Sequence, residues 1–410
     1  MHVMTTERVP IKLWSPPIQH APACDTWPGE LRLDCELPDG LYCSCQREVI
    51  QQFKNLANHP LTFKHVAGMP DFHLGYGMPI GGVLATRGGV IPNAVGVDIG
   101  CGMIAMRTQW LAREFDSDRL QELRMAIHQR VPVGNAHHTN PVGLPDVRIG
   151  QSLPVVGKEL LRAAYQMGTL GGGNHFIELQ SDDGGGLWIM LHSGSRNIGY
   201  QVCQYYHKVA QQLMARYHSN IPDPDLAFLP EETIECGNYL AEMNWCMNFA
   251  EANRRAILAA VMEAFVAVIG VKPFCLKNDL VDTHHNFVAK ENHFGQNVWV
   301  HRKGAVKATG LVTIPGSMGT ASYIGRGLEP RESFNTCSHG AGRVMGRRVA
   351  KALITHDEAV AEMAHVVFGV REGAVDEMPR CYKDIEDVMA AQVDLVEPVF
   401  RLQPLAVVKG

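Results

Sequence analysis

The sequence predicts an α+β fold. Strand-like and helical stretches are mixed along the chain without the strict alternation of a doubly wound parallel sheet. Gly75–Met106 is rich in glycine and β-branched residues and lacks helical periodicity, which favours short strands joined by tight turns. The two clearest helices, by periodicity and by their Ala, Leu, Met and Glu content, span Gln201–His218 and Ala241–Ile269.

The other elements are predicted in chain order. We expect a helix over Glu48–Asn58, a strand over Phe63–Asp71 that runs into a turn at Pro70, and an amphipathic helix over Asp116–Arg130. The stretch Val131–Pro154, rich in Pro, Gly and His, is predicted to be a surface loop. The remaining expected helices lie in Lys158–Gln166, Asp357–Val367 and Asp384–Ala391, and the remaining strands in Gly168–Glu178, Leu187–Gly199, Leu280–Lys290, Asn297–Arg302, Gly310–Gly319 and Val399–Gly410.

Composition is that of an ordinary globular protein. Of the 410 residues 46% are hydrophobic and 19% are charged, so a large core is available. The most apolar stretch, Ala256–Val271, is interrupted by Glu263 and falls short of the roughly 20 residues that a bilayer span needs. The first residues lack the apolar region of a signal peptide, and we expect a cytoplasmic protein. The net charge of -5 gives no overall basic surface, so any nucleic acid would have to be held in a local groove.

The eleven cysteines, an odd number without repeating spacing, do not resemble a disulfide framework. Cys24, Cys35, Cys43 and Cys45 lie in a Pro-containing N-terminal stretch, where they could hold a structural zinc. Their irregular spacing favours unpaired thiols instead. We divide the chain into an N-terminal segment, residues 1–60, packed on or appended to the core, and a main domain, residues 61–410.

The stretch Val95–Gly102 (VGVDIGCG) contains a carboxylate and a thiol close together in the sequence. Asp98 and Cys101 stand three residues apart between glycines in an apolar run, which suits two ligands of one cation. Taken alone, such a pair is more often a turn residue and a buried thiol, and its spacing matches no closed zinc motif.

Histidines beside glycine or asparagine recur at the ends of predicted strands. Imidazole, thiolate and carboxylate together suit a transition metal such as Zn or Mn. One Asp, one Cys and three His exceed the needs of one tetrahedral ion, so we expect two ions bridged by the thiolate. The glycine-flanked polar residues in question are Asp98, Cys101, Asn174, His175, His192, His284, His285 and His339.

His339 stands among small residues (CSHGAGR), where we expect a helix to start with Arg343 one turn on. Backbone N–H groups at a helix start and an arginine form a phosphate site. A histidine there can act as general base, phosphate donor or covalent nucleophile. The alternative is a helix-capping histidine without chemistry. The P-loop, dinucleotide, Lys-x-Asp-Gly and His-Glu-x-x-His motifs are all missing from the sequence.

A series of motifs, in the same order along the chain, closely resembles the RtcB family of RNA ligases. They are MPDFHLG (Met69–Gly75), VGVDIGCGM (Val95–Met103), GTLGGGNHFIE (Gly168–Glu178), HSGSRNIG (His192–Gly199), HHNFVAKE (His284–Glu291), RKGAV (Arg302–Val306), IPGSMG (Ile314–Gly319), CSHGAGR (Cys337–Arg343), YKDI (Tyr382–Ile385) and the terminal VKG. The resemblance covers roughly residues 61–410. It implies one RtcB-like catalytic domain of mixed, largely antiparallel sheets flanked by helices.

The resemblance implies a GTP- and Mn2+-dependent ligase that joins an RNA 3'-phosphate or 2',3'-cyclic phosphate end to a 5'-hydroxyl end. In the family a histidine takes the guanylate from GTP, and the matching residue is His339. The guanylate then passes to the RNA 3'-phosphate, and the 5'-hydroxyl displaces GMP; a cyclic phosphate is first opened by hydrolysis. We expect a role in RNA repair rather than tRNA splicing, and an archease-like activator as a further partner.

The resemblance also assigns site residues, motif by motif. Asp98, Cys101, His175, His192 and His285 match the metal ligands, with Cys101 bridging two ions; His285 is chosen over His284 because the family histidine precedes an asparagine. Asn174, Glu178, Ser317, Tyr382 and Lys409 match nucleotide contacts, Arg196 and Arg343 match phosphate contacts, and Asp71 matches an acid that orients or activates the nucleophile. The residue chemistry alone would favour zinc, and manganese comes only from the resemblance.

Three features depart from the family pattern. Gly346 stands where a serine is usual, the N-terminal segment is longer and Cys-rich, and the loop Val131–Pro154 is shorter. These edges leave the choice of RNA open. Two other functions compete with ligation: a di-metal phosphoesterase that hydrolyses RNA ends through the same ligands, and a non-catalytic module that binds RNA ends.

Overall fold

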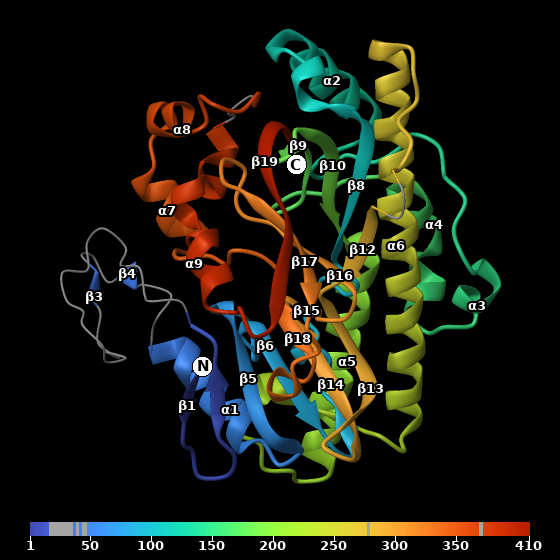
Figure 1. Cartoon of the computed structure of the whole chain (residues 1–410). Coiled ribbons are helices and arrows are strands. Elements are labelled where there is room, and N and C mark those ends of the chain that lie inside the picture. The colour runs from blue at the N-terminus through green and yellow to red at the C-terminus, as the bar shows by residue number, and fades with distance from the viewer. Residues whose placement is uncertain (16–35, 38–40, 43–46, 277–278, 369–371) are drawn as a thin grey trace.

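The computed structural model describes residues 1–15, 36–37, 41–42, 47–276, 279–368 and 372–410, and two large sheets form its centre (Figure 1). The six-stranded sheet has the order β1-β2-β5-β6-β14-β13, and the seven-stranded sheet has the order β12-β8-β10-β9-β19-β17-β16. Among the described strand pairs only β2 and β5 run parallel. The α+β prediction with largely antiparallel sheets is therefore confirmed.

The strands have the following bounds. The six-stranded sheet contains β1 (His2–Met4), β2 (Ile11–Leu13), β5 (Thr62–His73), β6 (Ile80–Thr86), β13 (Asn286–His293) and β14 (Gln296–Lys303). The seven-stranded sheet contains β8 (Gly102–Leu111), β9 (Phe176–Asp182), β10 (Gly186–Ser193), β12 (Leu280–His284), β16 (Leu311–Ile314), β17 (Ser322–Gly327) and β19 (Val396–Lys409). Small pairs are formed by β3 (Glu36–Leu37) with β4 (Leu41–Tyr42), β7 (Gly89–Val90) with β11 (Leu229–Pro230), and β15 (Ala305–Lys307) with β18 (Thr336–Ser338).

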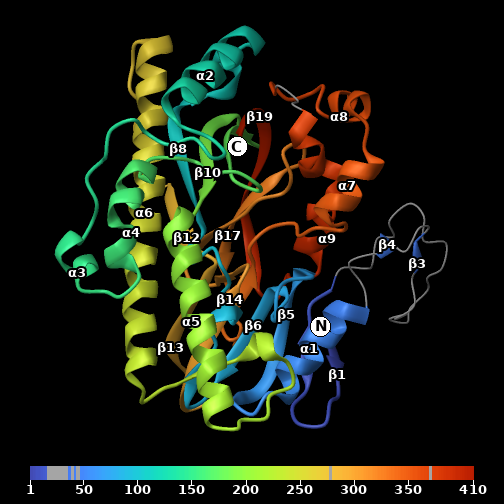
Figure 2. The same cartoon turned by 180° about the vertical axis from the view of Figure 1, so that it is seen from behind.

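The helices surround these sheets (Figures 1 and 2). They are α1 (Arg47–Asn58), α2 (Ser117–Arg130), α3 (Val147–Gln151), α4 (Val156–Gln166), α5 (Arg196–Arg216), α6 (Ile234–Ile269), α7 (Arg347–Leu353), α8 (His356–Glu362) and α9 (Ile385–Ala390). The two clearest sequence predictions correspond to α5 and α6, which bury Tyr206, Tyr239 and Phe249 in one cluster. Within the described part of the chain, no helix is both long and apolar enough to cross a membrane.

The seven-stranded sheet curls so that its edge strands meet. Thr283 on β12 and Thr313 on β16 share a hydrogen bond between their hydroxyl groups at 3.1 Å. Side chains alternate across the sheet: Leu191 on β10 packs in the cluster under α2 and α6, whereas Trp188 and Met190 face the other side. The same alternation puts His192 on the face of Trp188 and Met190.

Two local predictions were wrong. Pro70 does not make a turn, because β5 continues to His73; the ladder with β6 shifts register between Gly68 and His73, where a proline is tolerated. The predicted loop Val131–Pro154 contains α3. Gly150 lets this short helix approach Trp245 closely, since a Cβ atom there would lie 2.9 Å from the indole nitrogen.

The start of the chain joins the core through β1 and β2, at the edge of the six-stranded sheet. The expected helix over Glu48–Asn58 is α1. The four N-terminal cysteines, Cys24, Cys35, Cys43 and Cys45, lie outside the described residues. The choice between structural zinc and free thiols, and the boundary at residue 60, therefore stay predictions.

Candidate active site

The topology gathers the predicted metal ligands at one end of four neighbouring strands, β12, β8, β10 and β9. Because these strands are antiparallel, the ends of β10 and β12 lie beside the starts of β8 and β9. Gly102 at the start of β8 pairs with both Ser193 and His284 at the ends of the neighbouring strands. Cys101, His175 and His285 directly precede or follow these strands. His192 is the second-last residue of β10, and Asp98 lies four residues before the start of β8.

The ligand atoms converge on Cys101. Its Sγ atom lies 3.1 Å from His192 Nε2 and 3.3 Å from His175 Nε2. His192 Nε2 lies 3.3 Å from His285 Nε2, and His175 Nε2 lies 3.2 Å from an Asp98 oxygen. These atoms form two groups that share Cys101: Cys101, His192 and His285 form one, and Asp98, Cys101 and His175 form the other.

Backbone carbonyls fix two of the imidazoles. His175 Nδ1 bonds to the Leu170 carbonyl at 2.9 Å, and His192 Nδ1 bonds to the Asn174 carbonyl at 3.1 Å. A carbonyl only accepts, so Nδ1 carries the proton in both rings and Nε2 presents a lone pair to the cluster. A hydrogen bond from the other ring nitrogen to a backbone carbonyl is typical of histidines that bind a metal.

Burial sets the charge of the cluster. It lowers the pKa of His192 and His285 well below the ordinary value, so both rings are neutral at pH 7. Burial, and then the Asp98 carboxylate, raise the pKa of the Cys101 thiol. Neutral imidazoles, a thiol and a carboxylate in one buried place fit a transition metal, whose charge would favour the thiolate.

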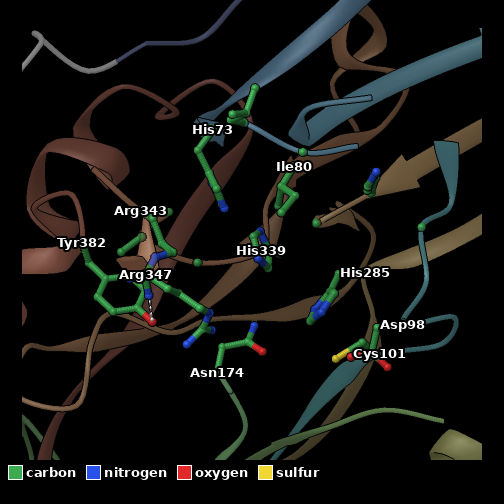
Figure 3. Close-up of a pocket in the computed structure, with 18 of the residues that line it drawn as sticks. His73, Ile80, Asp98, Cys101, Asn174, His285, His339, Arg343, Arg347 and Tyr382 are labelled. Atoms are coloured by element: carbon green, nitrogen blue, oxygen red, sulfur yellow. Dashed lines mark hydrogen bonds between the residues drawn. The ribbon is translucent and has the colours of Figure 1, made fainter. Parts of the chain in front are cut away.

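His339 adjoins this cluster. Its ring lies next to that of His285 (Figure 3), with the two ring centres 4.8 Å apart. The ring centre of His285 in turn lies 5.0 Å from that of His192. His339 and His285 also line a cleft of about 800 Å³ together with Asp98 and Cys101. The predicted nucleophile therefore lies beside the ligand cluster and lines the same cleft.

Asp71 holds His339 by both its side chain and its backbone. The Asp71 carboxylate, fully buried, accepts from His339 Nδ1 at 2.6 Å, from the His339 backbone N–H at 3.0 Å and from the Gly340 N–H at 3.3 Å. An ionised carboxylate only accepts, so Nδ1 carries the proton and Nε2 keeps a lone pair. His339 is thus set up as a nucleophile or a base through Nε2.

The predicted helix start at His339 was wrong, because helix α7 begins only at Arg347. His339 directly follows strand β18. The small residues serve close packing: Gly342 has φ +74°, and a Cβ atom there would lie 2.1 Å from the Asp71 carbonyl oxygen. Two backbone N–H groups expected to face a phosphate are bonded to Asp71 instead.

Figure 3 shows Arg343 and Tyr382 on the other side of His339 from His285. Lys409, Asn174 and Ser317 line the same cleft. A carboxylate that the sequence did not single out, Glu377, joins three of these side chains. It accepts from Arg343 at 3.2 Å, from the Tyr382 hydroxyl at 2.6 Å and from Lys409 Nζ at 2.8 Å.

Arg347 also pairs with Glu377. Burial alone would raise the pKa of Glu377, but Lys409 and Arg347 lower it to about 2, so the side chain is ionised. The only sequence signal for Glu377 is its place five residues before Tyr382 of the YKDI motif.

Four of the predicted site residues are not among the described residues that line the cleft: Asp71, His175, Glu178 and Arg196. Asp71 and His175 contact residues that do line it, whereas Glu178 and Arg196 bond elsewhere. Glu178 is buried on β9 and accepts from Gln180 at 2.7 Å, and burial raises its pKa to about 8. Arg196 donates to the Thr169 hydroxyl at 3.1 Å and to the Gly134 carbonyl at 3.3 Å. Their contacts to a nucleotide and to phosphate stay predictions.

Comparison with known proteins identifies clear relatives. The family model described as tRNA-splicing ligase RtcB matches residues 52–152 and 148–410. The RNA-splicing ligase RtcB of Escherichia coli (strain K12) is 39% identical over 433 residues, which cover 100% of this chain and 99% of the relative. The tRNA-splicing ligase RtcB of Methanococcus maripaludis is 30% identical over 99% of both chains. The RNA-splicing ligase RtcB of Mycobacterium tuberculosis is 34% identical, covering 88% of this chain and 100% of the relative.

Proposed function

The chain belongs to the RtcB family of RNA ligases, and from this premise we propose that it joins RNA 3'-phosphate or 2',3'-cyclic phosphate ends to 5'-hydroxyl ends, using GTP and Mn2+. The observation that carries the proposal is the Asp71–His339 pair. Asp71 holds His339 Nδ1 at 2.6 Å, and the ring borders both the ligand cluster and the cleft. A hydrolase that uses the same ligands would need no histidine nucleophile.

In the proposed reaction His339 Nε2 attacks the α-phosphate of GTP. The new N–P bond forms as the bond to pyrophosphate breaks, and Asp71 stabilises the positive charge that develops on the imidazole. The guanylate then moves to the RNA 3'-phosphate, which restores His339, and the 5'-hydroxyl oxygen displaces GMP. A cyclic phosphate is first opened by water.

Asp98, Cys101, His175, His192 and His285 would hold the metal. Two Mn2+ ions bound there would offset phosphate charge and align nucleophile and leaving group. Support comes from the donor set, in which Cys101 belongs to both ligand groups.

On the nucleotide side, Arg343 and Lys409 supply positive charge next to Tyr382, which suits a bound triphosphate. We propose Asn174, Glu178, Ser317, Tyr382 and Lys409 as nucleotide contacts, and Arg196 and Arg343 as phosphate contacts. A repair role in the cytoplasm and an archease-like activator belong to the same proposal.

The test is the covalent intermediate. Incubation of the wild-type protein with GTP and Mn2+ is expected to add the mass of GMP to the chain, and His339→Ala is expected to abolish the adduct. His137→Ala, in an exposed loop, is the control and keeps it. An unchanged wild-type mass contradicts the ligase mechanism and favours the phosphoesterase.

The metal centre is tested separately through Cys101→Ala. We expect this variant to lose bound Mn2+, measured by isothermal titration, and to fail to join a 3'-phosphate RNA to a 5'-hydroxyl RNA. If joining persisted at the wild-type rate, the thiolate would not take part in the site and the proposed ligand set would be wrong.

A further inference from the structure

One side of the cleft carries an aromatic ring that neither the proposed mechanism nor the ligand set uses. Tyr76 is 77% exposed and Leu74 is 44% exposed, and both line the cleft that contains His339. Single exposed apolar side chains are normal on protein surfaces. The setting of Tyr76 distinguishes it, because the ring is exposed at the active-site cleft on a backbone that is held firmly.

Two hydrogen bonds and one close approach of the backbone hold the loop that carries Tyr76. Gln52 on α1 donates to the Gly75 carbonyl at 2.6 Å, and Lys303 Nζ donates to the Tyr76 carbonyl at 2.6 Å. Gly77 has φ +68°, and a Cβ atom there would lie 3.0 Å from Asp225 atoms. A fixed backbone leaves the Tyr76 ring only its own torsions to order on binding, which lowers the entropic cost of a contact.

The same loop is tied to the nucleophile. Lys303, which holds the Tyr76 carbonyl, is followed by Gly304, where a Cβ atom would lie 3.0 Å from a ring carbon of His339. Gly304 also packs against Ile80, which is seen beside His339 in Figure 3. The position of the tyrosine relative to His339 is therefore set by adjacent residues of one strand end.

We propose that Tyr76, with Leu74, is a stacking platform for a nucleobase at the RNA end that is being joined. The proposal rests on the proposed ligase function. A chain with a net charge of -5 has no overall basic surface to retain RNA, so local contacts at the cleft must contribute. Stacking on an aromatic ring accepts any base, which suits an enzyme that joins ends of different sequence.

The test uses the full-length protein and RNA oligonucleotides with 2-aminopurine at the terminal nucleotide. One oligonucleotide carries it at a 3'-phosphate end and the other at a 5'-hydroxyl end, which tells the two RNA ends apart. Wild-type protein is expected to quench the fluorescence of one of them. Tyr76→Ala is expected to lose the quenching and to weaken binding of that RNA about 5- to 150-fold, the usual range for one stacked base.

Two variants serve as controls. Tyr76→Phe keeps the ring and is expected to keep both quenching and affinity. Tyr217→Ala removes a tyrosine that is 51% exposed outside the cleft, and is expected to behave like the wild type.

The outcomes separate the platform from the ligase function. The GMP adduct is measured on the wild-type protein in parallel, and its absence overturns the proposed function. If the adduct forms but neither RNA is quenched, or Tyr76→Ala quenches and binds like the wild type, the platform alone is overturned. In that case the ring is free to contact a protein partner instead.

Discussion

Replacing Asp71 by asparagine tests how the proposed nucleophile, His339, is activated. Asp71 Oδ2 accepts three N–H groups, two from His339 and one from Gly340, whereas Oδ1 is buried and has no hydrogen-bond partner among the described residues. The side chain introduced by Asp71→Asn is nearly isosteric, so its amide oxygen can take the place of Oδ2. Its NH2 group must then occupy the place of Oδ1. That place is enclosed by the backbone of Gly81, where a Cβ atom would lie 2.9 Å from Oδ1.

The magnitude follows from the change of acceptor. A hydrogen bond to a charged group contributes about 1.5–3 kcal/mol and one between neutral groups about 0.5–1.5 kcal/mol. The substitution therefore removes about 1–2 kcal/mol from the stabilisation of the imidazole as it becomes positively charged. That lowers the rate of guanylylation about 5- to 30-fold.

Asp71→Ala goes further, because Nδ1 loses its acceptor and the tautomer is no longer fixed. We expect a loss between ~10-fold and the ~10⁴-fold that follows a wrong tautomer in the serine protease triad. The buried amide of Asp71→Asn also lacks an acceptor, which costs about 1–3 kcal/mol of folding stability.

Single-turnover mass spectrometry of the GMP adduct at saturating GTP measures the chemical step directly, and urea unfolding gives the stability of each variant. The expected order of rates is wild type, Asp71→Asn, Asp71→Ala. Equal rates for all three would refute the assignment of Asp71 as the residue that positions and supports His339. A rate that falls only in proportion to the folded fraction would refute it as well, since the effect would then be one of stability.

Three further predictions concern carboxylates and a helix cap. Glu377→Gln leaves Arg343, Arg347 and Lys409 without their shared buried partner and is expected to cost about 3–5 kcal/mol of unfolding free energy at pH 7. Since the folded pKa of Glu377 is about 2, its contribution is present above pH 4.5 and is lost as the pH falls towards 2, so urea unfolding at pH 3 should show a smaller difference. The pH dependence of stability due to Glu178 has the opposite sign. Its folded pKa is about 8, so its contribution to the unfolding free energy is full below pH 4.5 and is lost as the pH rises through 8. Relative to Glu178→Gln, the wild type should lose about 1.4 kcal/mol per pH unit between pH 5.5 and 7.5, and parallel unfolding curves would contradict this. Gly346→Ser should stabilise the protein by a few tenths of a kcal/mol, because Gly346 is the N-cap of α7 and a Cβ atom there meets nothing within 4 Å; Gly346→Ala, without a hydroxyl, should not raise the melting temperature.

The cluster of candidate metal ligands could be predicted because most of its members are marked locally. Asp98 and Cys101 stand between glycines, and His175 and His285 each neighbour an asparagine. The sheet topology then brings these residues together, because they lie at one end of four neighbouring antiparallel strands. A local pattern is sufficient when the strands that carry it are adjacent in one sheet.

The Asp71–His339 pair could be predicted only through the family resemblance. The two residues are separated by 268 positions, with Asp71 on β5 and His339 directly after β18, and no periodicity relates them. Local pattern was misleading here, because glycines that pack His339 against Asp71 look like the small residues of a helix start. Glu377 was missed for a related reason: its role exists only where Arg343, Tyr382 and Lys409 converge from three separate stretches.

A gap in the six-stranded sheet explains why Asp71 can serve His339. Between Gly68 and His73 strand β5 loses its register with β6, so the backbone around Asp71 lacks part of its ladder. Lys383 fills the gap: its buried Nζ donates to the carbonyls of Pro70 and Phe72, one on each side of Asp71, at 2.9 and 2.8 Å. Lys383 thus holds the strand where the backbone of a neighbouring strand is missing, and the Asp71 side chain, between these two carbonyls, accepts from His339 and Gly340. Pro70 and Lys383 therefore belong to one local feature: β5 leaves its ladder with β6 where Asp71 contacts the proposed nucleophile, His339.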